Sequence, residues 1–366
     1  MTRILCILSS LNMGGAETFM MKLYRKLDRE RYQMDFIVSA EGVYDKEVDS
    51  LGGKIYRIPL RTEHPFGSFF AIRKIVKENK YNSVLKLCDT PIGVTDLLAA
   101  RMGGAKRVCV RSCNASSDDS RLKETVNSIL RPLFNRLAKV KFAPSLMAAE
   151  YTFGKKCVEK GKVSLLHNAV DIDHYSFNEE AGKNIRKELG VSEDAILFGH
   201  VGRFSHQKNH KFLIEIFEKI NRQSNEARLV LVGSGGLENE IKDMVRTKGL
   251  SDKVLFLGNR SDIPEILSAL NVFLLPSFYE GLPNTVVEAQ ATGLSCLVAD
   301  TVTREANVAE LVEYLPLGEA ELWAEKCLAA ASAARADSEY VRQAFLKNKY
   351  DIGSIVEEFL SLVVGR

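Results

Sequence analysis

The chain is predicted to be an α/β protein with two doubly wound parallel sheets, one in each half. Short apolar runs alternate with amphipathic stretches along both halves, which is the spacing expected of βαβ units. The length of 366 residues corresponds to roughly two domains. A hydrophobic fraction of 46% with 27% charged residues is that of an ordinary globular protein.

The first half begins with an apolar run at 3–10. A Gly-Gly turn and an amphipathic stretch at 16–28 follow it, without the small-residue cleavage site of a signal peptide, so we interpret it as a buried strand. The same alternation then continues. Further strands are predicted at 32–39, 54–59, 83–88, 106–111, 141–145 and 163–167, and further helices at 69–79 and 120–140.

The second half repeats this rhythm. Strands are predicted at 195–201, 228–233, 253–258, 271–276 and 295–299, and helices at 210–222, 236–249, 262–270 and 284–292. The boundary is expected within 170–180, where the periodicity is lost and the sequence becomes polar. We therefore predict domains at 1–175 and 176–349, with a terminal helix at about 350–366 that packs back on the first. The segment 114–120 (NASSDDS) is predicted to be a mobile loop.

Cysteine usage and charge indicate the setting. Seven scattered cysteines form neither a C-x-x-C pair nor a disulfide framework, which indicates a reducing cytoplasm. No apolar run approaches the ~20 residues that span a bilayer. Residues 1–170 hold 29 Lys and Arg against 17 Asp and Glu, a charge of +12, and the remainder carries −9. Such a cationic half suits a membrane surface, a lipid phosphate or nucleic acid, or simply attracts the anionic half.

The most informative segment is 276–293 (PSFYEGLPNTVVEAQATG). A strand ends at Pro276, Pro283 suits the first turn of a helix and Gly293 suits its C-terminal cap, so Glu280 lies in a loop and Glu288 in the helix. Eight helical residues would span ~12 Å, beyond the ~5–9.5 Å of a glycosidase pair. The spacing suits two carboxylates on different hydroxyls of one extended ligand, or else two solvated charges at a helix end.

Three glycine-containing or cationic loops follow predicted strands. Arg203 and Lys208 lie between a strand and a helix in HVGRFSHQKNH, where two cations suit a diphosphate or are ordinary surface charges. VGSGG at 232–236, with Gly233, brings backbone N–H groups close to a ligand or forms a plain turn. Gly14 and Gly15 follow the first strand in the same way.

Together these segments resemble the family 4 retaining glycosyltransferases of the GT-B fold, particularly bacterial exopolysaccharide and capsule transferases. The resemblance extends over nearly the whole chain and rests on GGAE, HNAVD at 167–171, VGR with QKNH, LVGSGG, and YEGLPN with the second glutamate. It implies two Rossmann-like lobes that face an interlobe cleft. The first would lie on the acceptor side, and the second would bind the nucleotide sugar.

The resemblance also implies roles for single residues. Glu280 would contact the donor sugar, Glu288 the nucleotide ribose, and Arg203 with Lys208 the diphosphate. Gly14 and Gly15 would lie against the donor, and the base would bind near 257–263, without a metal. The remaining expected donor-binding residues are Gly233, Asn259, Arg260, Gly281, Leu282, Pro283 and Asn284.

One stretch departs from the family. Relatives carry a histidine at the end of the fifth strand of the first lobe, whereas this chain reads VCVRSCNAS, with Arg111 and Cys113 at the expected positions. Arg111 is our candidate for a catalytic role in its place, and Asn114 is a further candidate. The alternative is that Arg111 pairs with a neighbouring acid and is not catalytic.

The expected reaction moves a hexosyl group with retention from a nucleoside-diphosphate sugar, UDP-sugar being favoured, and needs no cofactor. The acceptor would be a glycan or a polyprenyl-diphosphate-linked glycan in surface polysaccharide synthesis, and nucleic acid is not an expected partner. Two alternatives remain open. One is a GT-B-fold sugar-nucleotide epimerase, and the other is a non-catalytic subunit of a transferase pair.

The segment 120–141 is a basic amphipathic helix in sequence, with Arg131, Arg136 and Lys139 beside apolar residues. This pattern, together with the +12 half, indicates peripheral contact with an anionic membrane. The alternative is a helix packed on the first lobe with a solvated cationic face. We expect a cytoplasmic protein at the inner face of the cell membrane.

Overall fold

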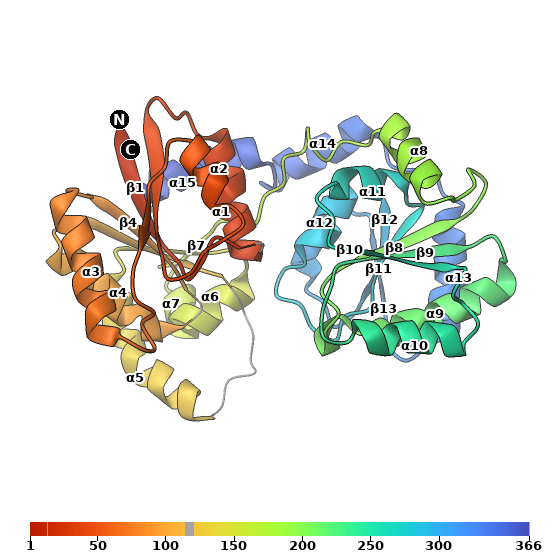
Figure 1. The fold of residues 1–366 in the computed structure, drawn as a ribbon, viewed down its shortest axis with the longest axis horizontal. Helices are drawn as coiled ribbons and strands as arrows, with labels where there is room; N and C mark the ends of the chain where they lie inside the picture. The colour runs from red at the N-terminus through yellow and green to blue at the C-terminus, as the bar shows by residue number, and fades with distance from the viewer. Residues whose placement is uncertain (13, 89, 114–120, 366) are drawn as a thin grey trace. The chain divides into compact units, whose positions relative to one another are not determined.

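The computed structural model describes residues 1–12, 14–88, 90–113 and 121–365. It contains two compact units, each drawn in Figure 1. Unit 1 comprises Met1–Ala169 and Asp351–Arg366, and unit 2 comprises Val170–Tyr350. These boundaries lie within a few residues of those expected from the sequence. The expected mobile loop at 114–120, with Asn114, lies outside the described residues.

Unit 1 contains a parallel seven-stranded sheet in the order β3-β2-β1-β4-β5-β6-β7. Alternate residues of a strand point to opposite faces, and β1 follows this rule: Leu5 and Ile7 join one core cluster while Ile4 and Cys6 join another. The strands are β1 Thr2–Ile7, β2 Tyr32–Val38, β3 Ile55–Arg57, β4 Ser83–Cys88, β5 Arg107–Ser112, β6 Val140–Ala143 and β7 Ser164–Leu165.

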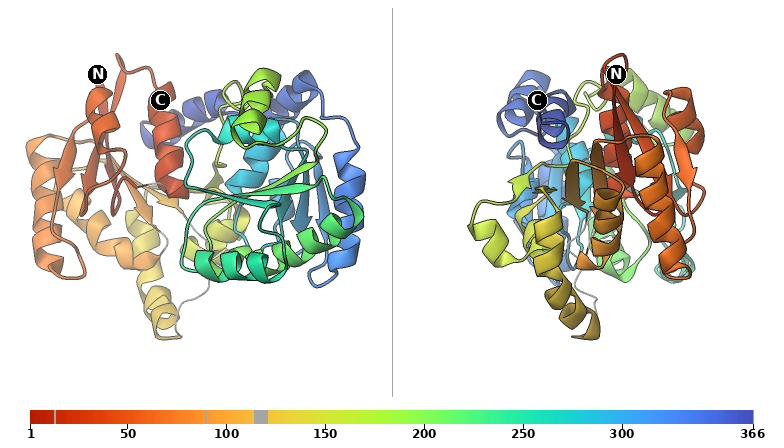
Figure 2. Two further views of the ribbon diagram at one scale, coloured as in Figure 1. Left: turned by 45° about the vertical axis from the view of Figure 1, so that its right-hand side comes forward. Right: turned by 90° about the vertical axis from the view of Figure 1, so that its left-hand side faces the viewer.

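Helices cover both faces of this sheet (Figures 1 and 2). Helices α1 and α15 pack together on one face, and α3, α4 and α5 contribute to the core of the other. The terminal helix α15 is held by a hydrogen bond from Arg107 Nε to the Leu362 carbonyl at 2.8 Å. The helices are α1 Gly15–Lys26, α2 Asp45–Ser50, α3 Pro65–Glu78, η1 Pro91–Gly93, α4 Val94–Met102, α5 Arg121–Leu137, α6 Leu146–Phe153, α7 Lys155–Glu159 and α15 Ile352–Val363.

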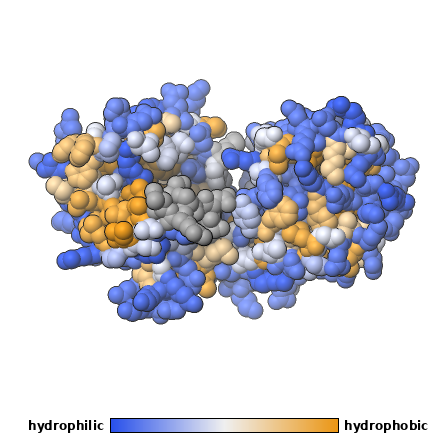
Figure 3. Space-filling view, turned by 90° about the horizontal axis from the view of Figure 1, so that it is seen from below, coloured by the Kyte–Doolittle hydropathy of each residue, from blue (hydrophilic) through white to orange (hydrophobic). Residues whose placement is uncertain are grey.

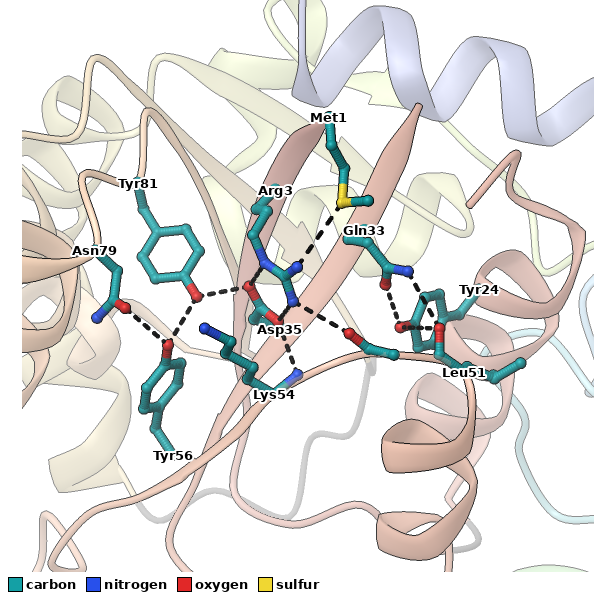
Figure 4. Close-up of polar contacts among 11 residues, drawn as sticks. Met1, Arg3, Tyr24, Gln33, Asp35, Leu51, Lys54, Tyr56, Asn79 and Tyr81 are labelled. Carbon is teal, nitrogen blue, oxygen red and sulfur yellow. Dashed lines mark hydrogen bonds and ion pairs between the residues drawn. The ribbon is translucent and has the colours of Figure 1, made fainter. Parts of the chain in front are cut away.

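A buried carboxylate joins the first three strands of unit 1 (Figure 4). Asp35 is fully buried and accepts hydrogen bonds from Arg3 Nε at 2.5 Å, the Tyr81 hydroxyl at 2.6 Å and the Lys54 backbone N–H at 2.7 Å. The hydrogen bond to Asp35 raises the pKa of Arg3. The buried charge is thus paired and hydrogen-bonded, as burial requires.

Unit 2 contains a parallel six-stranded sheet in the order β10-β9-β8-β11-β12-β13, the strand order of a dinucleotide-binding Rossmann domain. A single core cluster of buried residues fills both faces of the sheet. The strands are β8 Leu197–Val201, β9 Arg228–Val232, β10 Val254–Gly258, β11 Val272–Leu275, β12 Ser295–Ala299 and β13 Val312–Leu315. The helices are α8 Glu179–Glu188, η2 His206–Lys208, α9 His210–Gln223, α10 Glu238–Thr247, α11 Ile263–Ala269, α12 Asn284–Ala291, η3 Arg304–Ala306, α13 Ala320–Ala331 and α14 Ser338–Lys347.

The beginnings of β8 and β11 are tied together by Asn271. Its side-chain oxygen accepts from the Leu197 N–H at 2.8 Å and from Arg186 Nη2 at 2.6 Å, and its own N–H donates to the Leu197 carbonyl at 2.7 Å. Arg186 and Arg335 also donate to carbonyls at the end of α11, where a cation suits the helix dipole. The beginning of β11 is therefore fixed relative to the beginning of β8.

Candidate functional site

The site of unit 2 lies at the point where the order of the strands reverses. β8 and β11 are neighbours in the sheet but not in the chain, and β9 and β12 lie outside them. In open α/β sheets, ligands bind beyond the carboxyl ends of the strands at such a switch point. The two loops that leave these ends, 202–209 and 276–283, carry Lys208 and Glu280.

The loop after β8 is anchored by Phe204. This side chain is buried and stacks on the His210 ring with centroids 4.2 Å apart. The loop ends at Asn209, whose φ of 52° lies in the left-handed region that asparagine tolerates. Arg203, next to the anchor, is exposed, and its side chain makes no hydrogen bond or ion pair within the part of the chain that the structure describes. The anchored loop thus presents Arg203 to solvent.

Lys208 and Glu280 form an ion pair. Lys208 Nζ lies 2.7 Å from Glu280 Oε1, and the two side chains are only 15% and 9% exposed. Gln207 strengthens the link, because its Nε2 donates to the Tyr279 carbonyl at 3.0 Å and to Glu280 Oε2 at 3.3 Å. The Phe278 N–H donates to the Gln207 carbonyl at 2.9 Å. The two loops are therefore hydrogen-bonded to each other through both backbone and side chains.

The second loop is also held from β12. Thr301 Oγ1 donates to the Ser277 carbonyl at 2.9 Å, and Ser277 is fully buried. Pro283 is the N-cap residue of α12 rather than part of its first turn, and the helix begins at Asn284. Gly293 follows the helix with φ of 75°, as its predicted place at the C-terminal cap requires. The expected donor-binding residues Gly281 and Leu282 lie between Glu280 and this helix.

The structure places the two glutamates in the predicted elements. Glu280 lies in the loop and Glu288 inside α12, where its side chain is buried. The interpretation that both are solvated helix-end charges is wrong for this pair, because Glu280 is ion-paired and Glu288 is only 9% exposed. The Glu280 carboxylate is instead held against the Lys208 loop, and Glu288 is buried within α12.

The glycines of VGSGG allow two loops to touch. Gly233 has φ of 129°, and a Cβ there would lie 2.2 Å from the Gly202 carbonyl oxygen. A Cβ at Gly235 would lie 2.4 Å from the Phe204 carbonyl oxygen. These glycines thus press the loop after β9 against the loop that carries Arg203, which is a structural reason for them beside the expected contact with a ligand.

Asn259 and Arg260, the two residues expected near the base, contact different parts of unit 2. Asn259 is exposed and accepts a hydrogen bond from Ser234 Oγ at 3.2 Å, so it adjoins the glycine loop. Arg260 donates instead to Asp262 and to Glu188 of α8, at 2.5 to 3.3 Å. Its guanidinium is occupied by two carboxylates, so we expect it to contact a donor only if these contacts are exchanged.

Arg111 is fully buried at the end of β5 in unit 1. Its Cζ lies 4.2 Å from the centroid of the Phe19 ring, and its Nη2 donates to the side-chain oxygen of Asn168. No carboxylate among the described residues pairs with it, and burial lowers its pKa. Cys113 donates through Sγ to the Arg111 carbonyl at 3.7 Å. A catalytic contact by Arg111 stays a prediction, and its burial favours action through Phe19 and Asn168.

Gly14 and Gly15 mark the start of α1, with Gly14 as the N-cap residue. A Cβ at Gly14 would lie 2.2 Å from Glu17 Oε2, so the Glu17 carboxylate folds back over the first turn of the helix. A carboxylate is favourable there. No group of three or more His, Cys, Asp or Glu side chains suited to a metal ion occurs within the described ranges.

Sequence reasoning missed Gln207, which joins the two loops, and Thr301 with Ser277, which hold the second loop from the end of β12. Gln207 lies beside Lys208 in the same motif, so its position was a signal that could have found it. Thr301 lies beyond the glutamate motif and carried no local signal. Chemically, the arrangement offers a carboxylate for sugar hydroxyls beside cations for a diphosphate.

Matches to known proteins show the family of the chain. Residues 182–315 match the family described as Glycosyl transferases group 1, and residues 13–174 match Glycosyltransferase Family 4. The chain is similar to the putative glycosyltransferase EpsF of Bacillus subtilis, with 33% identity over 98% of this chain and 96% of that protein.

A second relative is the UDP-Gal:alpha-D-GlcNAc-diphosphoundecaprenol alpha-1,3-galactosyltransferase of Escherichia coli, 26% identical over 79% of this chain and 76% of that protein. Among solved structures, Anabaena Alr3699/HepE in complex with UDP-glucose superposes with a TM-score of 0.79 at 20% identity, and the whole of both chains is covered. The fold is therefore GT-B, and the chain belongs to the family 4 glycosyltransferases.

Proposed function

We propose that this glycosyltransferase moves a hexosyl group with retention from a nucleoside-diphosphate sugar, with UDP favoured, and without a metal ion. The observation that carries the proposal is the Lys208–Glu280 ion pair at the switch point of unit 2. The pair puts a cation for the diphosphate beside a carboxylate for the sugar. Glu288 of α12 would bind the ribose.

The chemistry follows from charge. As the bond from the anomeric carbon to the diphosphate breaks, the leaving oxygen gains negative charge, which Lys208 and Arg203 would stabilise. The acceptor hydroxyl would attack the same face and pass its proton to the departing phosphate. Glu280 would hold a sugar hydroxyl while Lys208 turns from the carboxylate toward the diphosphate. Two cations supply here the electrostatic stabilisation that a divalent ion supplies elsewhere.

The test uses the full chain, UDP-hexoses and a polyprenyl-diphosphate-linked glycan acceptor. We expect transfer of the labelled hexose with the anomeric configuration of the donor, read by NMR coupling constants, and the same rate with EDTA as without it. A product of inverted configuration would contradict retention. A rate abolished by EDTA and restored by Mg²⁺ would contradict metal independence.

We further propose a polyprenyl-diphosphate-linked or other glycan acceptor that binds to unit 1 at the cytoplasmic face of the membrane. The relatives support this, since the E. coli protein is named for a diphosphoundecaprenol-linked substrate. No helix within the described residues has the length and apolarity to cross a bilayer. Contact with the lipid surface would then be peripheral.

Helix α5 offers the surface for that contact. Phe134 is buried in unit 1, whereas Val126, Ile129 and Leu133 are exposed, Ile129 to 70%. Apolar surface is visible on this unit in Figure 3. Arg136 and Lys139 at the end of the helix are exposed, and unit 1 carries a formal charge of +10 against −7 for unit 2. Exposed apolar and cationic groups together suit an anionic lipid surface.

Reversal of Arg136 and Lys139 to glutamate should release the protein from vesicles that contain anionic lipid. Arg131 is left in place, because its Nη2 donates to the Tyr151 carbonyl at 3.3 Å. Each cation near the surface contributes ~1 kcal/mol, so a loss of at least about tenfold in vesicle affinity is expected at low salt. Sedimentation with vesicles is the measurement.

The matched control reverses Lys74 and Lys77 of α3, which changes the charge of unit 1 by the same amount. We expect this control to sediment like the wild type. Equal sedimentation of the Arg136/Lys139 variant and the wild type would mean that the cationic end of α5 is a solvated face.

A further inference from the structure

The junction between β8 and β11 is short for two neighbouring strands. Their ladder has two register pairs, Phe198 with Val272 and Gly199 with Phe273. The beginnings of the strands are tied by Asn271, as described above. At the carboxyl ends, where the two loops of the site leave the sheet, the ladder has already stopped.

The side chain of His200 links the two strands at the point where the ladder ends. Its side chain is fully buried, and its Nδ1 lies 2.8 Å from the Leu274 carbonyl oxygen. A carbonyl oxygen can only accept, so Nδ1 carries a proton. Burial, with the nearby His210 and Lys208, lowers the pKa of His200 well below its usual value, so the ring is neutral at neutral pH. A neutral ring has one N–H, so Nε2 carries no proton. A side-chain hydrogen bond therefore replaces the next rung of the sheet.

The other edge of the His200 ring lies under the Lys208 loop. A Cβ placed on Gly202 would lie 2.8 Å from His200 Nε2 and 3.1 Å from Lys208 Cε. The imidazole, the glycine and the lysine stem thus meet at one point. The Nδ1 side of the His200 ring contacts β11, which leads into the Glu280 loop. The Nε2 side faces the loop after β8, which carries Lys208. His200 therefore lies between the two segments that carry Lys208 and Glu280.

We propose that His200 is a positioning residue for transfer, which couples the Lys208 loop to the Glu280 loop through its hydrogen bond to Leu274. The inference rests on the proposed function. Catalysis requires the diphosphate cation and the sugar carboxylate to be held in one geometry, and displacements of ~1 Å cost about 100-fold in rate. Loss of this bond would leave the end of the β8–β11 junction to the contacts of Gln207 and the Lys208–Glu280 ion pair.

His210 provides the contrast. Its ring is buried, stacks on Phe204 and lies edge-on to His200 with centroids 4.8 Å apart. Within the part of the chain that the structure describes, neither of its ring nitrogens has a hydrogen-bond partner. Burial lowers its pKa to about 4. His210 therefore acts through packing, and phenylalanine should replace it without loss of turnover.

Two substitutions separate the hydrogen bond from packing. In His200→Asn, the side-chain amide places an N–H at the same number of bonds from Cα as Nδ1, so the bond to Leu274 survives in a smaller side chain. His200→Leu preserves more of the volume and removes the donor. A merely structural residue would make turnover follow thermal stability, so the leucine variant would be the better enzyme.

We expect the opposite order. At a temperature where all variants are folded, His200→Leu should lower kcat about tenfold or more, the equivalent of ~1.4 kcal/mol. His200→Asn should recover most of that loss although its melting temperature is the lower of the two. UDP affinity by calorimetry should stay within about threefold of the wild type in both, and His210→Phe should turn over like the wild type.

A leucine variant with wild-type kcat would overturn the inference, and so would an asparagine variant as slow as the leucine one. Failure of the proposed function is distinguishable from either result. In that case the wild type would neither bind UDP nor transfer a hexose, and the variants at position 200 would behave in the same way.

Discussion

Replacement of Glu280 by glutamine should lower kcat by about 100-fold or more, with the fold intact. Glutamine has the same shape but no charge, so Lys208 loses its ion-pair partner and a sugar hydroxyl loses a charged acceptor. Gln207 Nε2 keeps an oxygen to which it can donate. Transfer of labelled hexose under single-turnover conditions is the measurement, with circular dichroism as the check on folding.

The matched control is Glu240→Gln on α10. Glu240 also pairs with a lysine of the same unit, Lys211, but this pair is about half exposed. Exposed pairs contribute little to stability, and neither residue belongs to the site. We expect turnover within about twofold of the wild type. If both glutamine variants retain full turnover, Glu280 is not part of the machinery.

Replacement of Asp35 by alanine should strongly destabilise unit 1. The substitution removes the acceptor of Arg3, Tyr81 and the Lys54 N–H. Breaking a buried charge pair on one side costs ~3–5 kcal/mol. Tyr81→Phe removes the hydroxyl that donates to Asp35 and contacts the Tyr56 hydroxyl, and it leaves the ion pair, so a loss of about 1–2 kcal/mol is expected.

The chain offers a probe for each unit in this experiment. Its single tryptophan, Trp323, is buried in unit 2, so its fluorescence reports unfolding there, whereas circular dichroism reports both units. In urea titrations, Asp35→Ala should move the circular dichroism transition to lower urea by more than the fluorescence transition. A circular dichroism transition that coincides with that of the wild type would show that the hydrogen bonds of Asp35 contribute nothing to the stability of unit 1.

The architecture was largely predictable because buried parallel strands read as continuous apolar runs. Each predicted strand is present, with ends shifted by at most three residues. The edge strand β13 was missed, since Glu313 and Tyr314 interrupt its apolar pattern. Helices α2, α4, α6 and α7 of unit 1 and α8, α13 and α14 of unit 2 were not predicted either. Helix α13, for example, is rich in alanine and gives little contrast between its faces. Hydrophobic periodicity gives no information about the order of strands in a sheet. The switch point between β8 and β11 was therefore found only in the structure.

The site was predictable in its parts and not in its assembly. Lys208 and Glu280 were each predicted from local motifs, but their ion pair depends on β8 and β11 being neighbours. Arg260 shows the reverse case: it carries the expected charge, yet Glu188 and Asp262 occupy it. His200 has no motif of its own, because its role depends on where the β8–β11 ladder stops.

In the proposed reaction, Lys208 binds the diphosphate and Glu280 binds the sugar. Calorimetry with UDP and with a UDP-sugar, chosen as the one that gives the largest thermal shift, tests this assignment on Lys208→Ala and Glu280→Gln. Lys208→Ala should weaken both ligands by at least about tenfold, since a charge-assisted contact contributes ~1.5–3 kcal/mol. Glu280→Gln should weaken the UDP-sugar and leave UDP within about threefold of the wild type. Unchanged UDP affinity in Lys208→Ala, together with lost UDP affinity in Glu280→Gln, would contradict the assignment.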